Sequence, residues 1–284
     1  MKFTKMHGCG NDYIYVNCLS QSLGGQVVAT PSKLAIKISD RHFGVGSDGL
    51  ILIMPSNKAD FRMRMFNADG SEGEMCGNGI RCIGKYVYDN KLTKKKNATV
   101  ETKGGIVTLT ISGFNKDRSV RAVEVNIGKI RPIPKTFYIK ATGKNTIIKD
   151  KLTVCGKKLS INVVSIGNPH CVIFVRNVDN YPVNELGPAI ENHRYFPSKT
   201  NVEFVETINQ NYVKQRTWER GSGETLACGS GACAVMAVIH NKDNAVDNVV
   251  IHLKGGKLNL RYSNNRNIYM RGPAVKICDG VFNF

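Results

Sequence analysis

The sequence predicts an α+β protein of two pseudo-symmetric domains, each a curved, barrel-like mixed β-sheet wrapped around one central helix. Three observations lead to this prediction. The chain has 284 residues, it repeats a cysteine- and glycine-rich segment, and strand-like stretches flank two helical ones. A chain of this length suits two domains of roughly 140 residues each.

The repeat is centred on two Cys-Gly-x-Gly segments. Cys76-Gly-Asn-Gly79 and Cys228-Gly-Ser-Gly231 lie 152 positions apart, and a Gly-Ser…Glu segment precedes each. A long period repeated twice indicates a duplicated domain and not a solenoid. Further pairs keep the same order and nearly the same offset: Lys103-Gly-Gly105 with Lys254-Gly-Gly256, and Gly10-Asn11 with Gly167-Asn168.

The strand predictions rest on alternation of apolar and polar residues. Residues 61–66, 106–111, 202–205 and 258–262 alternate with period two, which is typical of half-buried strands. The glycine pairs 104–105 and 255–256 stand next to such segments and predict hairpin turns.

A helical pattern follows each cysteine motif. Ile80, Ile83 and Val87 form one apolar face, whereas residues 232–239 are apolar on all sides. A helix that is apolar all round is buried, so we expect sheet to surround it. The expected domains are residues 1–129 with a C-terminal strand at about 272–284, and residues 130–271.

Composition narrows the classes of function. Forty basic against 22 acidic residues give a net charge of +18, which suggests an anionic partner such as nucleic acid. Lys94-Lys95-Lys96 is the longest basic run, and no nucleic-acid-binding motif accompanies it, so nucleic-acid binding is disfavoured. No apolar stretch of about 18 residues and no signal-peptide pattern occur. We expect a cytoplasmic protein without a membrane span.

The nine cysteines form an odd count without a secretory signal, which favours thiols in a reducing compartment. Most such cysteines are small buried apolar residues. Cys76 and Cys228 differ because glycines beside a helix start let a ligand approach the unpaired amides of the first turn. Those amides and the helix dipole stabilise both a thiolate and a bound carboxylate.

Two such motifs facing one substrate carbon would suit inversion of an α-carbon, which needs a base on one face and an acid on the other. The substrate carboxylate would accept amide hydrogen bonds from both helix starts. Three alternatives stay open at this point: a packed turn, a metal site and a redox-active cysteine pair. The cysteine spacings are longer than those of common structural zinc sites, and no pyridoxal or metal cofactor is predicted.

At these segments the sequence resembles the diaminopimelate epimerase family over essentially the whole chain. The resemblance implies a pyridoxal-independent homodimeric enzyme that interconverts LL- and meso-diaminopimelate for lysine and peptidoglycan synthesis, without metal or other cofactor. The matching segments are His7-Gly-Cys-Gly-Asn-Asp12, Asp40–Gly46, Phe66–Gly70, Met75–Cys82, Gly167–His170, Asn201–Val205 and Glu219–Cys233.

The resemblance also implies the site residues. Cys76 and Cys228 are the expected acid/base pair, and His170 is a possible supporting residue. Backbone amides expected on the reacting carboxylate belong to Gly77, Asn78, Gly229 and Ser230. Side chains expected to hold the other polar groups of the substrate are Asn11, Asn67, Asn168, Asn201, Glu219 and Arg220.

The sequence departs from the family at one substrate contact. Many members carry a glutamine where this chain reads Ser47-Asp48-Gly49, so we leave Gly49 out of the site. A proline-racemase-like enzyme is the nearest alternative. Glu219 and Arg220 argue against it, because a ring amino acid has no distal ammonium and carboxylate for them to bind.

Overall fold

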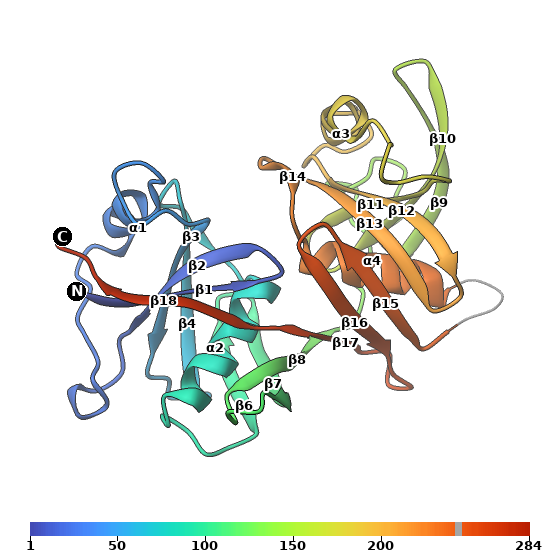
Figure 1. Cartoon of the computed structure of the whole chain (residues 1–284). Helices are drawn as coiled ribbons and strands as arrows, with labels where there is room; N and C mark the ends of the chain where they lie inside the picture. Colours follow the sequence, from blue (N-terminus) through green and yellow to red (C-terminus); the bar gives the residue numbers. More distant parts are fainter. Residues whose placement is uncertain (242–245) are drawn as a thin grey trace. The chain divides into compact units, whose positions relative to one another are not determined.

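The computed structural model describes residues 1–241 and 246–284, and these form two compact units (Figure 1). Unit 1 comprises Met1–Asn126 and Arg271–Phe284, and unit 2 comprises Ile127–Met270. None of the helices in these described ranges is long and apolar enough to cross a membrane.

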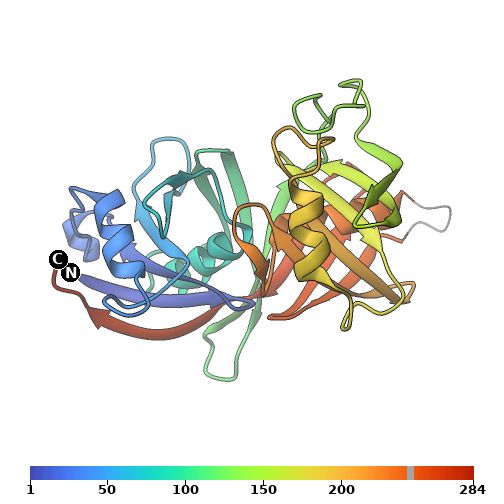
Figure 2. The same cartoon turned by 90° about the horizontal axis from the view of Figure 1, so that it is seen from above.

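Unit 1 is a curved mixed sheet with the helix α2 (Gly77–Asp89) packed on it. Its strand β18 (Val275–Val281) pairs antiparallel with β1, and Figure 2 shows the two chain ends side by side. The ammonium group of Met1 donates to the carbonyl of Phe282 over 2.8 Å. The remaining strands are β1 (Lys2–Gly8), β2 (Asn11–Asn17), β3 (Gly49–Met54), β4 (Phe61–Asn67), β5 (Glu72–Gly73), β6 (Asn97–Thr102), β7 (Gly105–Phe114) and β8 (Val120–Gly128).

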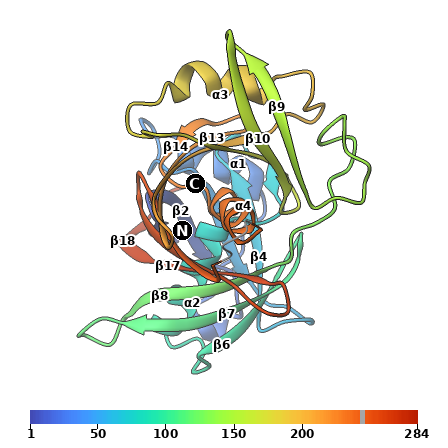
Figure 3. The same ribbon diagram turned by 90° about the vertical axis from the view of Figure 1, so that its right-hand side faces the viewer.

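Unit 2 repeats this plan around the helix α4 (Gly229–His240). The helix contacts β10, β11, β12 and β16, and Figure 3 shows the strands of this unit curving around it. The strands are β9 (Ile147–Val154), β10 (Lys157–Ser165), β11 (Pro169–Phe174), β12 (Asn201–Asn209), β13 (Tyr212–Glu219), β14 (Gly223–Thr225), β15 (Asn248–Leu253) and β16 (Gly256–Tyr262). The strand β17 (Ile268–Pro273) begins in unit 2 and ends in unit 1.

The two units pair their strands in the same order. In unit 1, β1 to β4, then β6 and β7, follow the series antiparallel, parallel, antiparallel, parallel, antiparallel. In unit 2, β10 to β13, then β15 and β16, follow the same series. The shared order supports the duplication that the cysteine motifs indicate.

The central helices bury the faces that the sequence predicts. Ile80, Ile83 and Val87 of α2 are buried, and every residue from Ala232 to Ile239 of α4 is buried. The alternating strand segments likewise lie in β4, β7, β12 and β16. The α+β prediction with one helix inside each curved sheet is confirmed.

Each unit has a further peripheral helix that the sequence analysis did not predict. α1 (Pro31–Ser39) places Leu34, Ala35 and Ile38 in a core cluster with strands of unit 1. α3 (Val183–Glu191) does the same in unit 2, although Pro188 lies inside it.

The hairpin turns differ slightly from the prediction. Residues 104 and 255 lie in turns, but Gly105 and Gly256 already begin β7 and β16. Both have positive φ, 124° and 147°, a region that only glycine occupies without strain. The second glycine of each pair therefore starts the returning strand.

Candidate active site

Cys76 is the residue that caps the N-terminus of α2. Its backbone is extended (φ −121°, ψ 118°), and its Sγ accepts from the amide of Gly79 over 3.4 Å. Gly79 packs closely against β3, since a Cβ at that position would lie 2.6 Å from Cδ1 of Ile51. The amides of Gly77 and Asn78 belong to the first turn of the helix, which has no preceding carbonyl partners.

Cys228 caps α4 in the same way, with φ −114° and ψ 111°. Its Sγ accepts from the amide of Gly231 over 3.4 Å, and the residue is 5% exposed. A Cβ on Gly231 would lie 2.5 Å from Oε1 of Glu203. Two thiols thus sit at equivalent helix starts, each beside amides that favour negative charge.

The hairpin that leads to each cysteine is held by an arginine–glutamate pair. Arg64 of β4 donates twice to Glu72 of β5, over 2.7 and 3.1 Å. Arg216 of β13 donates twice to Glu224 of β14, over 2.7 and 3.0 Å. These bidentate pairs are 152 positions apart, as the cysteines are, and fix the approach of the chain to both caps.

Acidic side chains surround Cys228. Burial raises the pKa of its thiol well above the usual range, and the carboxylates of Glu219 and Glu203 raise it further. Glu219 accepts from Thr225 over 2.6 Å and from the Cys228 thiol. Burial raises the pKa of Glu219 as well, against the effect of those two hydrogen bonds. The half-buried Glu219 therefore lies beside the buried Cys228 thiol, whose Sγ also lies 3.5 Å from Oγ of Ser230.

His170 links this region to a predicted substrate contact. Its Nδ1 lies 2.8 Å from Oε1 of Glu203 and its Nε2 lies 3.0 Å from Oδ1 of Asn168. His170 and Glu203 are both fully buried. The ring thus holds the Asn168 side chain in one orientation while Glu203 lies under the start of α4.

Around Cys76 the partners are amides. Its Sγ donates to Oδ1 of Asn11 over 3.3 Å, and Nδ2 of Asn78 donates to the same oxygen over 3.4 Å. Nδ2 of Asn11 donates to Asp48 over 2.7 Å. Within unit 1 the structure therefore brings together Cys76, Gly77, Asn78 and Asn11.

The other predicted contacts make internal hydrogen bonds. Nδ2 of Asn67 donates to Ser71 over 3.0 Å in the turn after β4. Asn201 donates to the carbonyl of Pro169 over 2.9 Å and accepts from the amide of Arg220 over 3.0 Å. The guanidinium of Arg220 donates to the carbonyl of Ser198 over 2.9 Å. Within unit 2, Asn201 and Arg220 are neighbours, as are Asn168 and His170.

Three residues of these clusters were not predicted from the sequence: Glu203, Asp48 and Thr225. Glu203 stands between Val202 and Phe204 in an apolar strand segment, and a charge in such a place is a signal of a buried partner. Asp48 lies in the segment noted only for its lack of a glutamine. Thr225 had no sequence signal of its own.

Across residues 1–241 and 246–284, no group of three or more His, Cys, Asp or Glu side chains is arranged to hold a metal ion. All nine cysteines lie in these ranges, and none is in a disulfide.

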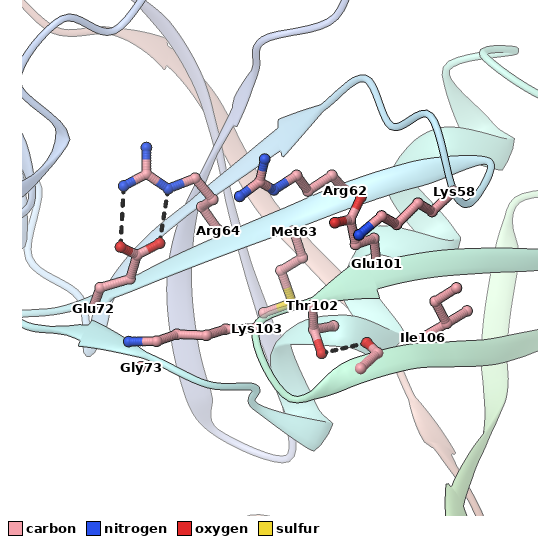
Figure 4. Close-up of a pocket in the computed structure, with 11 residues that line it drawn as sticks. Lys58, Arg62, Met63, Arg64, Glu72, Gly73, Glu101, Thr102, Lys103 and Ile106 are labelled. Atoms are coloured by element: carbon pink, nitrogen blue, oxygen red, sulfur yellow. Dashed lines mark hydrogen bonds and ion pairs between the residues drawn. The ribbon is translucent and has the colours of Figure 1, made fainter.

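A surface hollow of about 530 Å³ in unit 1 contains none of the predicted site residues. Figure 4 shows the Arg64–Glu72 pair at its wall. The charged residues that line it are Lys58, Arg62, Arg64, Lys103, Glu72 and Glu101. This hollow contributes to the basic surface and not to the cysteine caps.

The fold has solved counterparts. A phenazine biosynthesis protein of the PhzF family from Bacillus anthracis matches with TM-score 0.69 and 18% identity, covering 99% of this chain and 98% of that one. A probable proline racemase from Agrobacterium radiobacter K84 matches with TM-score 0.67 and 13% identity, covering 99% and 92%. The protein thus has the fold of the proline racemase and PhzF class.

Within that class the chain belongs to the diaminopimelate epimerase family, a family of isomerases. The family model for diaminopimelate epimerase matches residues 3–132 and 162–277. The diaminopimelate epimerase of Acetivibrio thermocellus is 49% identical over 282 residues, covering 99% of this chain and 98% of the relative. That of Methanococcus maripaludis is 48% identical over 282 residues, covering 99% of each.

Proposed function

We propose that this chain interconverts LL- and meso-diaminopimelate by two-base proton transfer at one α-carbon, with Cys76 and Cys228 as the two bases. The observation that carries the proposal is the pair of equivalent thiol caps on α2 and α4. Family membership and the relatives named diaminopimelate epimerase support this substrate over another amino acid. The proline-racemase alternative has support from fold likeness alone.

The reaction moves one proton off the α-carbon and another onto it. A cysteine thiolate takes the α-proton and becomes a thiol, while the electron pair of the broken C–H bond moves into the substrate carboxylate. The opposite cysteine thiol then gives its proton to the other face of the carbon and becomes the thiolate. The return reaction exchanges the two roles, so neither step needs an external oxidant or cofactor.

The carboxylate that receives this charge is proposed to lie on the amides of Gly77 and Asn78 from α2, and of Gly229 and Ser230 from α4. Helix-start amides and the helix dipole stabilise an anion there. Because negative charge on the carboxylate grows as the α-proton leaves, these hydrogen bonds strengthen in the transition state.

The remaining polar groups of the substrate are proposed to bind Asn11, Asn67, Asn168, Asn201, Glu219 and Arg220. Arg220 suits a carboxylate because a guanidinium can donate two parallel hydrogen bonds. His170 supports this set through its hydrogen bond to Asn168. Glu219 has a second proposed role, because it already accepts from Cys228: it takes up the thiol proton when Cys228 ionises.

A homodimer stays a prediction from the family resemblance, and a cytoplasmic location stays a prediction from the lack of a signal-peptide pattern. The absence of nucleic acid as a partner stays a prediction from the lack of a nucleic-acid-binding motif. The net charge of +18 is compatible with a solvated basic surface and with a surface that attracts a negatively charged substrate.

The test is replacement of each cysteine. Cys76→Ala and Cys228→Ala should each lower the rate of LL-to-meso conversion by about 10²-fold or more, the usual effect of losing a general acid or base. Cys155→Ala is the matched control, because Cys155 is exposed in the turn between β9 and β10. Full conversion by either catalytic variant, or preferred turnover of proline by the unaltered protein, would refute the proposal.

A further inference from the structure

The side-chain amide of Asn11 lies between the Cys76 thiol and a cluster of charged residues. Its Nδ2 donates to Oδ2 of Asp48 over 2.7 Å, and its Oδ1 accepts from Cys76 Sγ over 3.3 Å. Asp48 can act only as the acceptor in its contact with Asn11, because both of its carboxylate oxygens already accept hydrogen bonds from N–H groups. Oδ2 accepts from the amide of Asp12 over 3.0 Å, and Oδ1 accepts from Arg41 over 2.9 Å.

The other end of this line of hydrogen bonds is also fixed in direction. Arg81 is fully buried, and its Nη2 donates to Oδ1 of Asn78 over 2.8 Å. Because a guanidinium has donors only, Asn78 must turn its Nδ2 toward Asn11, to which it donates over 3.4 Å. The guanidinium of Arg81 packs against Gly8, where a Cβ would lie 2.8 Å from its Nη2.

The three hydrogen bonds therefore all donate in the same sense, from Arg81 to Asn78, from Asn78 to Asn11 and from Asn11 to Asp48. A donor-only group stands at one end and an acceptor at the other, so the amide of Asn11 has one permitted orientation. That orientation puts a carbonyl oxygen, and not an N–H group, against the sulfur of Cys76.

We propose that Asp48 is a positioning residue of the epimerisation site: by holding Nδ2 of Asn11, it keeps an acceptor on the Cys76 sulfur and so maintains Cys76 as a neutral thiol in the resting enzyme. This inference rests on the proposed function only for the catalytic role of Cys76. A hydrogen bond accepted from the neutral form disfavours the charged form. The thiol is then held as a proton donor until the substrate carbanion takes its proton.

Tyr15 and Cys82 are titratable groups near Cys76, and burial raises the pKa of both, that of Cys82 to about 11. Both are therefore neutral at neutral pH. Arg81 is the buried cation on the same helix, and its guanidinium is engaged with Asn78 and the carbonyl of Gly77.

The other half of the molecule lacks this arrangement. Asn168 stands where Asn11 stands in the repeat, but its Oδ1 is bound to His170 and not to Cys228. The two cysteines thus share a cap and differ in their other neighbours: the amide oxygen of Asn11 for Cys76, and the Ser230 hydroxyl and the Glu219 carboxyl group for Cys228.

The experiment measures iodoacetamide alkylation of Cys76 against pH, read by mass spectrometry of its peptide. In Asp48→Ala the Nδ2 group of Asn11 loses its acceptor, and only the 3.4 Å bond from Asn78 restrains the amide, so Oδ1 can leave the sulfur. Loss of an acceptor that binds the neutral thiol favours the thiolate. The midpoint of the rate-against-pH curve should fall by about one unit, equivalent to about tenfold faster alkylation at a fixed pH below it, with the plateau unchanged.

Two matched variants complete the test. Arg41→Ala removes the ion pair on the other oxygen of Asp48 but leaves its bond to Asn11, and Asp48→Asn keeps an acceptor oxygen. Both should keep the midpoint of the unaltered protein. The proposal is overturned by an unmoved midpoint in Asp48→Ala, by an equal shift in Arg41→Ala, or by a parallel shift at Cys228, which would indicate general loosening.

The alkylation assay contains no substrate, so its outcome is separate from that of the proposed function. A protein inactive on diaminopimelate would refute the proposed function and leave the alkylation result standing. An active protein whose Asp48→Ala variant keeps the Cys76 midpoint would refute the positioning role alone.

Discussion

At the scale of single residues, the two cysteine thiols cap their helices in the same way but have different neighbouring groups. Cys228 lies among buried carboxyl groups, whereas Cys76 lies against amides. The burial of Glu219 matters most for chemistry, because a raised pKa keeps its carboxyl group protonated to a higher pH than usual. In its protonated form it accepts neither the Cys228 proton nor a substrate ammonium.

Glu219 should therefore set an acid limb in the pH profile. The kcat/KM for diaminopimelate should rise with pH through a midpoint above 4.5, the ordinary value for glutamate. Glu219→Gln should lower kcat/KM by about 10²-fold or more and remove that limb. Glu185→Gln is the control, because Glu185 is an exposed carboxylate in the first turn of α3 and lies outside the predicted site.

The same ionisation has a signed effect on stability. Because the pKa of Glu219 is higher in the folded than in the unfolded chain, its contribution is full below the ordinary value. It is lost as pH rises through the raised pKa. The free energy of unfolding of the unaltered protein should thus fall through this window relative to Glu219→Gln. Equal pH dependence of activity and stability in both proteins would contradict the assignment.

Residue roles were only partly predictable from the sequence. The caps at Cys76 and Cys228 are local: the glycines that make them lie within three positions. The contacts of Asp48 with Asn11 and of Glu203 with His170 join residues 37 and 33 positions apart. These contacts depend on which strands become neighbours in the sheet. The parallel pairing of β2 with β3 and of β11 with β12 cannot be predicted from local sequence periodicity.

At the scale of elements, each half presents a hairpin, a cysteine cap and a buried helix in that order. The strands and central helices were predictable because alternation and the apolar faces are strong local signals. The peripheral helices α1 and α3 were not, because each has only nine residues. A proline inside α3 also argues against a helix in a sequence pattern.

The second glycines of the two cysteine motifs, Gly79 and Gly231, should differ in how well they tolerate replacement by alanine. In Gly231→Ala the new Cβ meets the Glu203 carboxylate, which His170 holds at 2.8 Å. In Gly79→Ala it meets the end of the Ile51 side chain, which can rotate. We expect Gly231→Ala to lower the free energy of unfolding by about 1–3 kcal/mol, as overpacking does, and Gly79→Ala to lower it less. Urea titration measures both, and equal losses would show that the Glu203 contact is not restrictive.

At the scale of the whole molecule, the two units repeat one order of strand pairing and one kind of cap. The Arg–Glu pairs of the two hairpins add a side-chain counterpart to that repetition. In the proposed mechanism the duplication accounts for the two cysteines. Inversion needs proton transfer on both faces of one carbon, and each of the two equivalent thiols would supply one transfer.

The most direct test of this central claim is conversion of LL-diaminopimelate in D₂O, followed by mass spectrometry of both isomers early in the reaction. Two separate bases predict one solvent deuterium at the inverted α-carbon of the meso product, while the remaining LL substrate keeps its hydrogen. Product that retains the original hydrogen, or early labelling of both isomers to the same extent, would contradict the account, because either pattern requires a single base that serves both faces.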